Sequence, residues 1–157
     1  MAETYTTEET VWLAIKARLI AAQSSTLSYV KKIYEGDRQV NVDYELPCIF
    51  MDIDSSSEEW VEFPRRRQNR MNIVLRGALD VRTRLDNQIV GDASQVGILR
   101  FESDIKKVFE GSDLKYDNYI QNYSFTTESR KLIDNAIREV SLRLRVDFKY
   151  FGTGERI

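Results

Sequence analysis

Thirteen residues late in the chain, 138–150, constrain the fold more than any other segment. Apolar and polar side chains alternate there: Val140, Leu142, Leu144, Val146, Phe148 and Tyr150 are separated by Ser141, Arg143, Arg145, Asp147 and Lys149. This period of two is typical of a β-strand that buries one face and exposes the other. At about 3.3 Å per residue the strand would reach about 43 Å. The chain must therefore contain a sheet with one solvated face and at least one unusually long strand.

Three further segments predict strands, and a fourth predicts a β region. Residues 48–54 and 119–126 alternate over short distances, and residues 70–83 alternate over a longer one. Residues 27–34 mix β-branched and aromatic side chains, which favours β structure. Gly77, in the middle of the longer strand, predicts a bulge or a bend.

Two segments have helical spacing. The first places Val11, Ile15, Leu19 and Ala22 on one stripe, and Thr6 with Glu9 forms a capping-box pattern before it. The second, at about 93–110, has an apolar stripe that includes Val96, Leu99, Ile105 and Val108, and Gly111 follows as a C-terminal cap. The sequence thus predicts an α+β fold: a mixed, mostly antiparallel sheet of about five to six strands with two helices packed on one face.

The length of 157 residues suits a single domain, 1–157. Between the predicted strands, residues 55–69 are expected to form a long loop and residues 127–135 a polar connection. The segment 152–157 is expected to be a flexible C-terminal end.

Composition excludes most catalytic chemistry. The chain has no His and a single cysteine, Cys48, so Ser-His-Asp triads, Cys-His pairs and cysteine metal clusters are all excluded. The net charge of −2 is not the footprint of a dedicated nucleic-acid binder. Apolar runs are too short for a membrane span, and the polar, acidic residues 1–9 do not resemble a signal peptide. We expect no enzyme activity, no catalytic residue, no cofactor and no bound metal, in a soluble protein assembled in a cytoplasm.

Two carboxylate patterns keep other chemistry open. Asp52 and Asp54 project to one side of a strand, as a Mg²⁺ or Mn²⁺ pair would, although a strand end entering solvent looks the same. Asp147 and Lys149 have the spacing of a metal-dependent nuclease, with Asp52 or Asp80 as the further acid. Any strand with a solvated, charged face also has this pattern.

The densest charge cluster predicts a contact with a partner. It combines aromatic and arginine residues, which are enriched in interface hot spots, over a short stretch: Trp60, Phe63, Arg65, Arg66, Arg67 and Arg70. The alternative is a solvated loop whose arginines offset Glu58, Glu59 and Glu62.

The order of these elements resembles a known family. A helix over 11–22 leads to a short strand that ends at Tyr34, and Leu46-Pro47 precedes the apolar strand over 48–51. A loop then leads to the long strand 71–81, followed by the helix 96–109 and the hairpin of 119–126 with 138–150. In this order the chain resembles the tail terminator proteins of long-tailed bacteriophages, which are also called tail-completion or head–tail joining proteins.

The resemblance implies a structural protein of the virion neck. Such proteins form a ring, expected to be hexameric, on the last ring of tail tube protein, where they stop tube growth. The ring presents a surface to the head-completion or connector protein, and genomic DNA passes through its lumen. The family has no catalytic residue to carry over, and its members are assembled in the host cytoplasm without a membrane.

Three alternatives remain open at this stage. The chain is also compatible with a neck or head-completion adaptor of the same kind of particle, with a small metal-dependent nuclease, or with a cytoplasmic adaptor outside any virion. The absence of His and of a basic groove argues against the nuclease.

Overall fold

The described part of the chain contains two helices and five strands. The computed structural model describes residues 8–39, 42–62, 66–82, 84, 86–110, 120–134 and 136–151, with side chains outside 56–62, 66–69, 120–122 and 149–151. In chain order the elements are α1 (Glu8–Ala22), β1 (Lys32–Glu35), β2 (Cys48–Glu62), β3 (Arg66–Asp80), α2 (Ile98–Phe109), β4 (Ile120–Ile133) and β5 (Ile137–Phe151). The predicted α+β class is confirmed.

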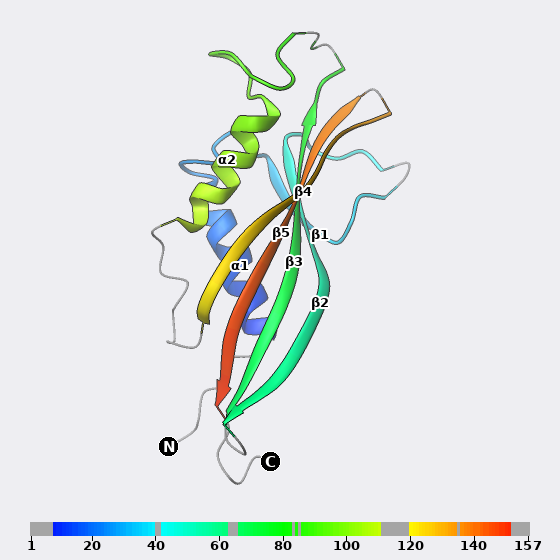
Figure 1. The fold of residues 1–157 in the computed structure, drawn as a ribbon. Coiled ribbons are helices and arrows are strands. Elements are labelled where there is room, and N and C mark those ends of the chain that lie inside the picture. Colours follow the sequence, from blue (N-terminus) through cyan, green and yellow to red (C-terminus); the bar gives the residue numbers. More distant parts are fainter. Residues whose placement is uncertain are drawn as a thin grey trace.

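The strands form one mixed sheet in the order β1-β2-β3-β5-β4. β1 is parallel to β2, and the other neighbours are antiparallel. β2, β3 and β5 each have 15 residues, about 50 Å of strand. In Figure 1 the ends of these three strands run past the lower end of α1.

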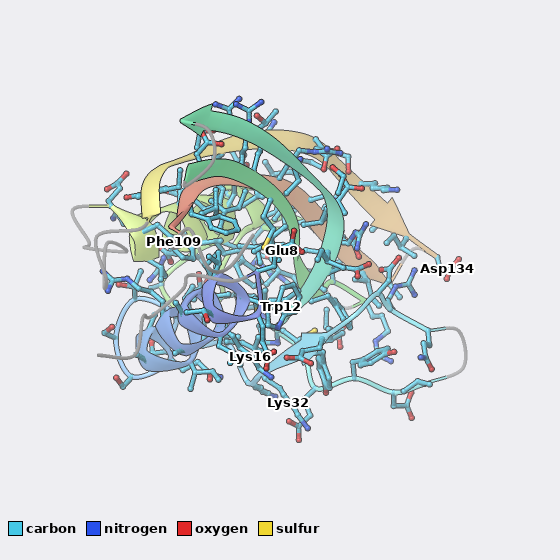
Figure 2. The ribbon with its side chains drawn as sticks, turned by 90° about the horizontal axis from the view of Figure 1, so that it is seen from below. Glu8, Trp12, Lys16, Lys32, Phe109 and Asp134 are labelled. Atoms are coloured by element: carbon cyan, nitrogen blue, oxygen red, sulfur yellow. The ribbon has the colours of Figure 1, made fainter. Side chains whose placement is uncertain are left out.

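Both helices cover the same face of the sheet, as the sequence predicts (Figure 1). Viewed along the strands, the sheet curves around the side that α1 occupies (Figure 2). The buried stripe of α1, from Val11 to Ala22, and that of α2, with Phe101 and Ile105, join the apolar side chains of β3 and β5 in one core. Apolar and polar residues alternate at 140–148 because β5 packs one of its faces against the helices and turns the other away from them.

Gly77 lets α2 approach the sheet closely. It pairs in register with Ile49 on one side and Val140 on the other, so the predicted bulge at this position is wrong. A Cβ atom there would lie 3.1 Å from Ile105 Cδ1 and 3.2 Å from the Phe101 ring. The bulges occur elsewhere, at Ile53/Ser55 and Trp60/Glu62 in β2 and twice in β4.

A smaller apolar cluster lies on the opposite face of the sheet. Cys48, Phe50 and Ala78 are buried there beneath Tyr34 and Tyr44. Burial, with a smaller contribution from Glu139, raises the pKa of the Cys48 thiol to about 12. The thiol is therefore protonated and unreactive at neutral pH.

The predicted long loop over 55–69 is wrong. β2 continues to Glu62 and β3 begins at Arg66, so most of this segment forms an antiparallel pair. The predicted connection over 127–135 is likewise mostly strand, because β4 continues to Ile133 opposite Ile137. In both places the backbone ladder with a neighbouring strand stabilises extended structure in a polar sequence that lacks the expected apolar alternation.

Other boundaries differ by a few residues. Residues 23–29 form turns after α1, and the β region predicted over 27–34 contributes only β1. α2 begins at Ile98 rather than near 93, because the preceding residues form a hydrogen-bonded turn. Thr6, Gly111 and the predicted flexible end 152–157 lie outside the described residues.

Candidate interaction surfaces

Three of the six predicted contact residues, Trp60, Arg66 and Arg67, lie on strands at one end of the sheet. We define the sheet tip as residues 60–62 of β2, 66–68 of β3 and 149–151 of β5. There Trp60 pairs with Arg67, Arg67 pairs with Tyr150, and Arg66 pairs with Phe151. Phe63 and Arg65 lie outside the described residues. The tip is a three-stranded extension of the sheet that passes the end of α1 (Figure 1).

Arg70, the last residue of the predicted contact cluster, is engaged within the chain. Its Nε donates to Asp147 Oδ1 at 2.9 Å across β3 and β5. A second arginine, Arg145, approaches the other oxygen of Asp147 at 3.4 Å. Arg70 is about half exposed whereas Asp147 is buried, so this arginine neutralises a buried carboxylate and also borders the tip.

The polar face of the sheet is covered by ion pairs between strands. Arg143 on β5 bridges Asp54 of β2 at 2.6 Å and Glu128 of β4 at 3.1 Å. Arg76 on β3 lies 3.8 Å from Asp52. Positive and negative side chains thus alternate across the sheet, and the face carries no large field of either sign.

These contacts bear on the two metal hypotheses. Asp52 and Asp54 each lie beside an arginine, Arg76 and Arg143 respectively. Asp80 accepts two hydrogen bonds from the guanidinium group of Arg82 and one from its backbone amide, and these bonds lower the pKa of the Asp80 carboxyl. Among the residues that the structure describes, no group of three or more acidic or cysteine side chains has the geometry of a metal site. The arrangement favours cross-strand stabilisation for Asp52 and Asp54 and a local ion pair for Asp80.

One carboxylate on this face, that of Glu139, is buried and has no ion pair within 4 Å among the described residues. Glu139 lies beside Ala78 in the register, near the small cluster around Phe50. Burial raises its pKa, and Arg76 and Arg38 partly offset that effect.

A shallow apolar groove of about 430 Å³ borders the first turn of α1. Trp12, Ile53 and Met71 line it, and Glu8, Glu9 and Asp52 supply its acidic rim. Ile53 is half exposed, and β2 has a register shift directly after it. Figure 2 shows Glu8 and Trp12 at the near end of α1, on the side of the sheet tip.

Two apolar surfaces escaped the sequence analysis. Ile89 and Val90 protrude from the connection between β3 and α2, and Leu13 and Ile20 are exposed on the outer side of α1. Leu99, placed in the buried stripe of α2 by its spacing, is also exposed. In the sequence, the Ile-Val pair stands between turn residues in the stretch Asp-Asn-Gln-Ile-Val-Gly-Asp, which could have indicated a protruding apolar turn. The helix at 8–22 has apolar residues on its outward side as well as on its buried side, which could have indicated the second surface.

No family model matches the chain, and no curated protein matches it. Among solved structures, a chain of the "Virion of native gene transfer agent (GTA) particle" is similar at 12% sequence identity and a TM-score of 0.49. The match covers 88% of this chain and 91% of that chain.

Within the part of the chain that the structure describes, neither α1 nor α2 has the length and the apolar run that crossing a bilayer requires.

Proposed function

We propose that this chain is a structural virion protein, a subunit of a tail terminator ring in a long-tailed phage or a phage-like particle. The observation that carries the proposal is the sheet tip, where three 15-residue strands extend past the helices. A domain gains little stability from strands that its own helices do not cover, so such an extension is suited to contacts with other subunits. The order of helix, strand and hairpin supports the same family resemblance.

The proposal assigns a binding partner to each end of the ring. The sheet tip and the predicted contact residues Trp60, Phe63, Arg65, Arg66 and Arg67 contact neighbouring subunits or the last ring of the tail tube. Aromatic and arginine residues are the type of side chain that dominates interface energies. The ring stops tube growth, offers its other side to the connector, and lets DNA pass through its lumen in the neck of the particle.

The decisive experiment removes the protein from a particle-producing strain. Loss of a terminator leaves tube growth unchecked, so the tails should become longer than wild-type tails and carry no heads. Loss of a neck or head-completion adaptor instead leaves tails of normal length. Electron microscopy of the lysate measures both tail length and head attachment, and normal tails without heads would reject the terminator role in favour of the adaptor.

A variant at the sheet tip tests the contact surface itself. Trp60→Ala combined with Arg65→Ala, Arg66→Ala and Arg67→Ala should stay folded, because surface substitutions usually cost about 0.5 kcal/mol or less each. The same variant should fail to join heads to tails. Arg82→Ala is the matched control, since Arg82 is an exposed arginine that pairs with Asp80 at the opposite end of β3.

The two measurements separate the possible outcomes. A collapse of the melting temperature would show that the tip contributes to the core. Normal assembly of the variant would show that the tip makes no essential contact, and the interface assignment would then be wrong.

A further inference from the structure

The most exposed large apolar side chain among those described is Val90, at 70%. It belongs to residues 86–92, which we call the apolar turn, and its neighbour Ile89 is also exposed. The turn lies in the connection that leaves the end of β3, at the upper end of Figure 1. Its charged residues are Asp86 and Asp92, so an apolar pair is flanked by two acids.

The apolar turn is held in one shape by its backbone. The amides of Ile98 and Leu99 donate to the carbonyls of Gln88 and Ile89, at 2.8 and 3.2 Å. Asp92 Oδ1 accepts hydrogen bonds from the amides of Ser94 and Gln95, and such bonds lower the pKa of Asp92 to about 2. A protruding turn that is already ordered loses little conformational entropy when it binds.

Two glycines allow this shape. A Cβ atom on Gly91 would lie 2.1 Å from the carbonyl oxygen of Gln95, and one on Gly97 would lie 2.4 Å from the carbonyl oxygen of Ile89. Any other residue at either position would force the backbone apart. The close packing supports the exposed position of Ile89 and Val90.

A complementary surface lies at the other end of α2. A hollow of about 490 Å³, which we call the helix-end hollow, separates the last turns of α1 and α2. Alanine side chains and Val108 form much of its wall, and its two charged lining residues are both basic, Arg18 and Lys107. Ile20, one residue before the lining residue Ala21, is exposed on α1. The rest of the lining is polar, with Ser25 and Thr26. Basic residues beside small apolar side chains match an apolar pair between aspartates in charge.

One molecule cannot join its own two surfaces. Leu99 and Val108 stand nine residues apart on α2, about 14 Å along the helix axis. The apolar turn is fixed at the first of these ends by its hydrogen bonds, and the hollow is at the second. A contact between the two surfaces must therefore join different copies.

We propose that the apolar turn of one copy docks in the helix-end hollow of a second copy of this chain. The contact is head to tail, because two different surfaces meet, and repeated contacts of this type close into a ring or continue as a filament. This contact would join neighbouring subunits of the ring proposed above, and the two surfaces on which it depends are defined without reference to that ring. Closure of a ring would add avidity to a small individual contact.

Two variants test the contact on the full-length protein. Val90→Asp places a charge in the docked pair, and Ala21→Glu places an acid and extra volume in the hollow. Each should weaken self-association, measured by analytical ultracentrifugation, by about tenfold or more. Val42→Asp is the control, because Val42 is an exposed valine on another loop and should leave association unchanged.

Mixing the two variants distinguishes a head-to-tail contact from a symmetric one. The Val90→Asp copy retains its hollow and the Ala21→Glu copy retains its apolar turn, so the mixture should form dimers and nothing larger. A symmetric contact through either surface would not be restored by mixing.

Cysteine pairs extend the test to weak association. A Val90→Cys copy mixed with a tagged Ala21→Cys copy should form a disulfide-linked heterodimer faster than the control mixture of Val42→Cys with Ala21→Cys. Cys48 is buried and should not interfere. Equal rates in the two mixtures would overturn the proposal, as would association that Val90→Asp leaves intact.

The outcome also separates this inference from the proposed function. If Val90→Asp abolishes head–tail joining but not self-association, the turn binds a different protein and the inference fails while the terminator role stands. If copies associate as proposed but tails keep normal length without the protein, the terminator role fails instead.

Discussion

The two helices pack on the same face of one sheet, but among the described residues their outward sides differ in polarity. The outward side of α2 is polar except for Leu99, and its buried acids are tied to neighbouring elements. Glu102 accepts a hydrogen bond from Arg130 at 2.8 Å, and Asp104 accepts one from Tyr29 at 2.7 Å. The bond to Asp104, after burial, helps raise the pKa of Tyr29.

The outward side of α1 differs. Leu13, Ala17, Ile20 and Ala21 lie exposed there, whereas Val11, Ile15 and Leu19 are buried on the other side. A helix with apolar residues on its outward side as well as on its buried side is suited to packing on both sides. In a single copy of the chain the outward side of α2 is mostly polar, whereas the outward side of α1 exposes apolar side chains that are suited to contact with another molecule in an assembly.

The largest expected effect is on the buried side of α2. Phe101 is fully buried, contacts Tyr29 edge to face at 5.5 Å between ring centroids, and lies against Gly77. Phe101→Ala should lower the free energy of unfolding by about 3–5 kcal/mol, because it removes a large side chain and leaves a cavity. Urea denaturation measures the loss. A loss below about 1 kcal/mol would show that α2 is not anchored by this residue.

The second-largest effect is expected at Glu102, which links α2 to β4 through hydrogen bonds. Burial alone would raise the pKa of Glu102, but hydrogen bonds from Arg130, Thr127 and Lys106 outweigh it and lower the pKa to about 2. Glu102→Gln should cost about 2 kcal/mol at pH 7, because a buried charge-assisted network is broken.

The pH dependence of this effect has a definite sign. A carboxyl whose pKa is lower in the folded state stabilises the fold above its unfolded pKa of about 4.5 and loses that contribution as pH falls toward about 2. The difference in unfolding free energy between wild type and Glu102→Gln should therefore shrink over that window. A difference that stays constant from pH 7 to pH 2 would contradict the assignment.

A smaller effect is expected where α2 meets the sheet. Gly77→Val adds a side chain against Ile105 and Phe101, which already lie within 3.2 Å of a Cβ position. Overpacking of this kind should cost about 1–2 kcal/mol, even though valine suits a strand better than glycine. Thermal unfolding checks the prediction, and an unchanged or higher melting temperature would show that α2 can shift outward.

The smallest effect on stability is expected on the outward side of α1. Leu13→Ser with Ile20→Ser should change the unfolding free energy by less than about 1 kcal/mol, since both side chains are half exposed. Ile15→Ser, on the buried side of the same helix, is the control and should be strongly destabilising. If the outer pair costs as much as Ile15, the contrast between the helices is wrong.

Much of the fold could be predicted because one face of the sheet is buried. The alternation at 140–148 and the helical stripe from Val11 to Ala22 both report that face directly, and the structure places them where expected. Residues 55–62 and 127–133 gave no such signal, because their sequences lack apolar alternation, yet the structure pairs them with β3 and β5. Their partners follow closely in the chain, with Arg66 opposite Glu62 and Ile137 opposite Ile133, but β-strand formation depends on pairing context more than on local propensity, so a polar stretch does not report it.

The sequence by itself determined the fold class, the two helices on one face and the absence of histidine chemistry, because periodicity and composition are local properties. Only the tertiary structure decided that Arg70 neutralises Asp147, that the arginine-rich segment belongs to a three-stranded tip, and that Val90 protrudes. These features depend on which strands become neighbours and on which side of α1 the sheet covers. Both are properties of packing between segments far apart in the chain, and packing decides which apolar residues are left for a partner.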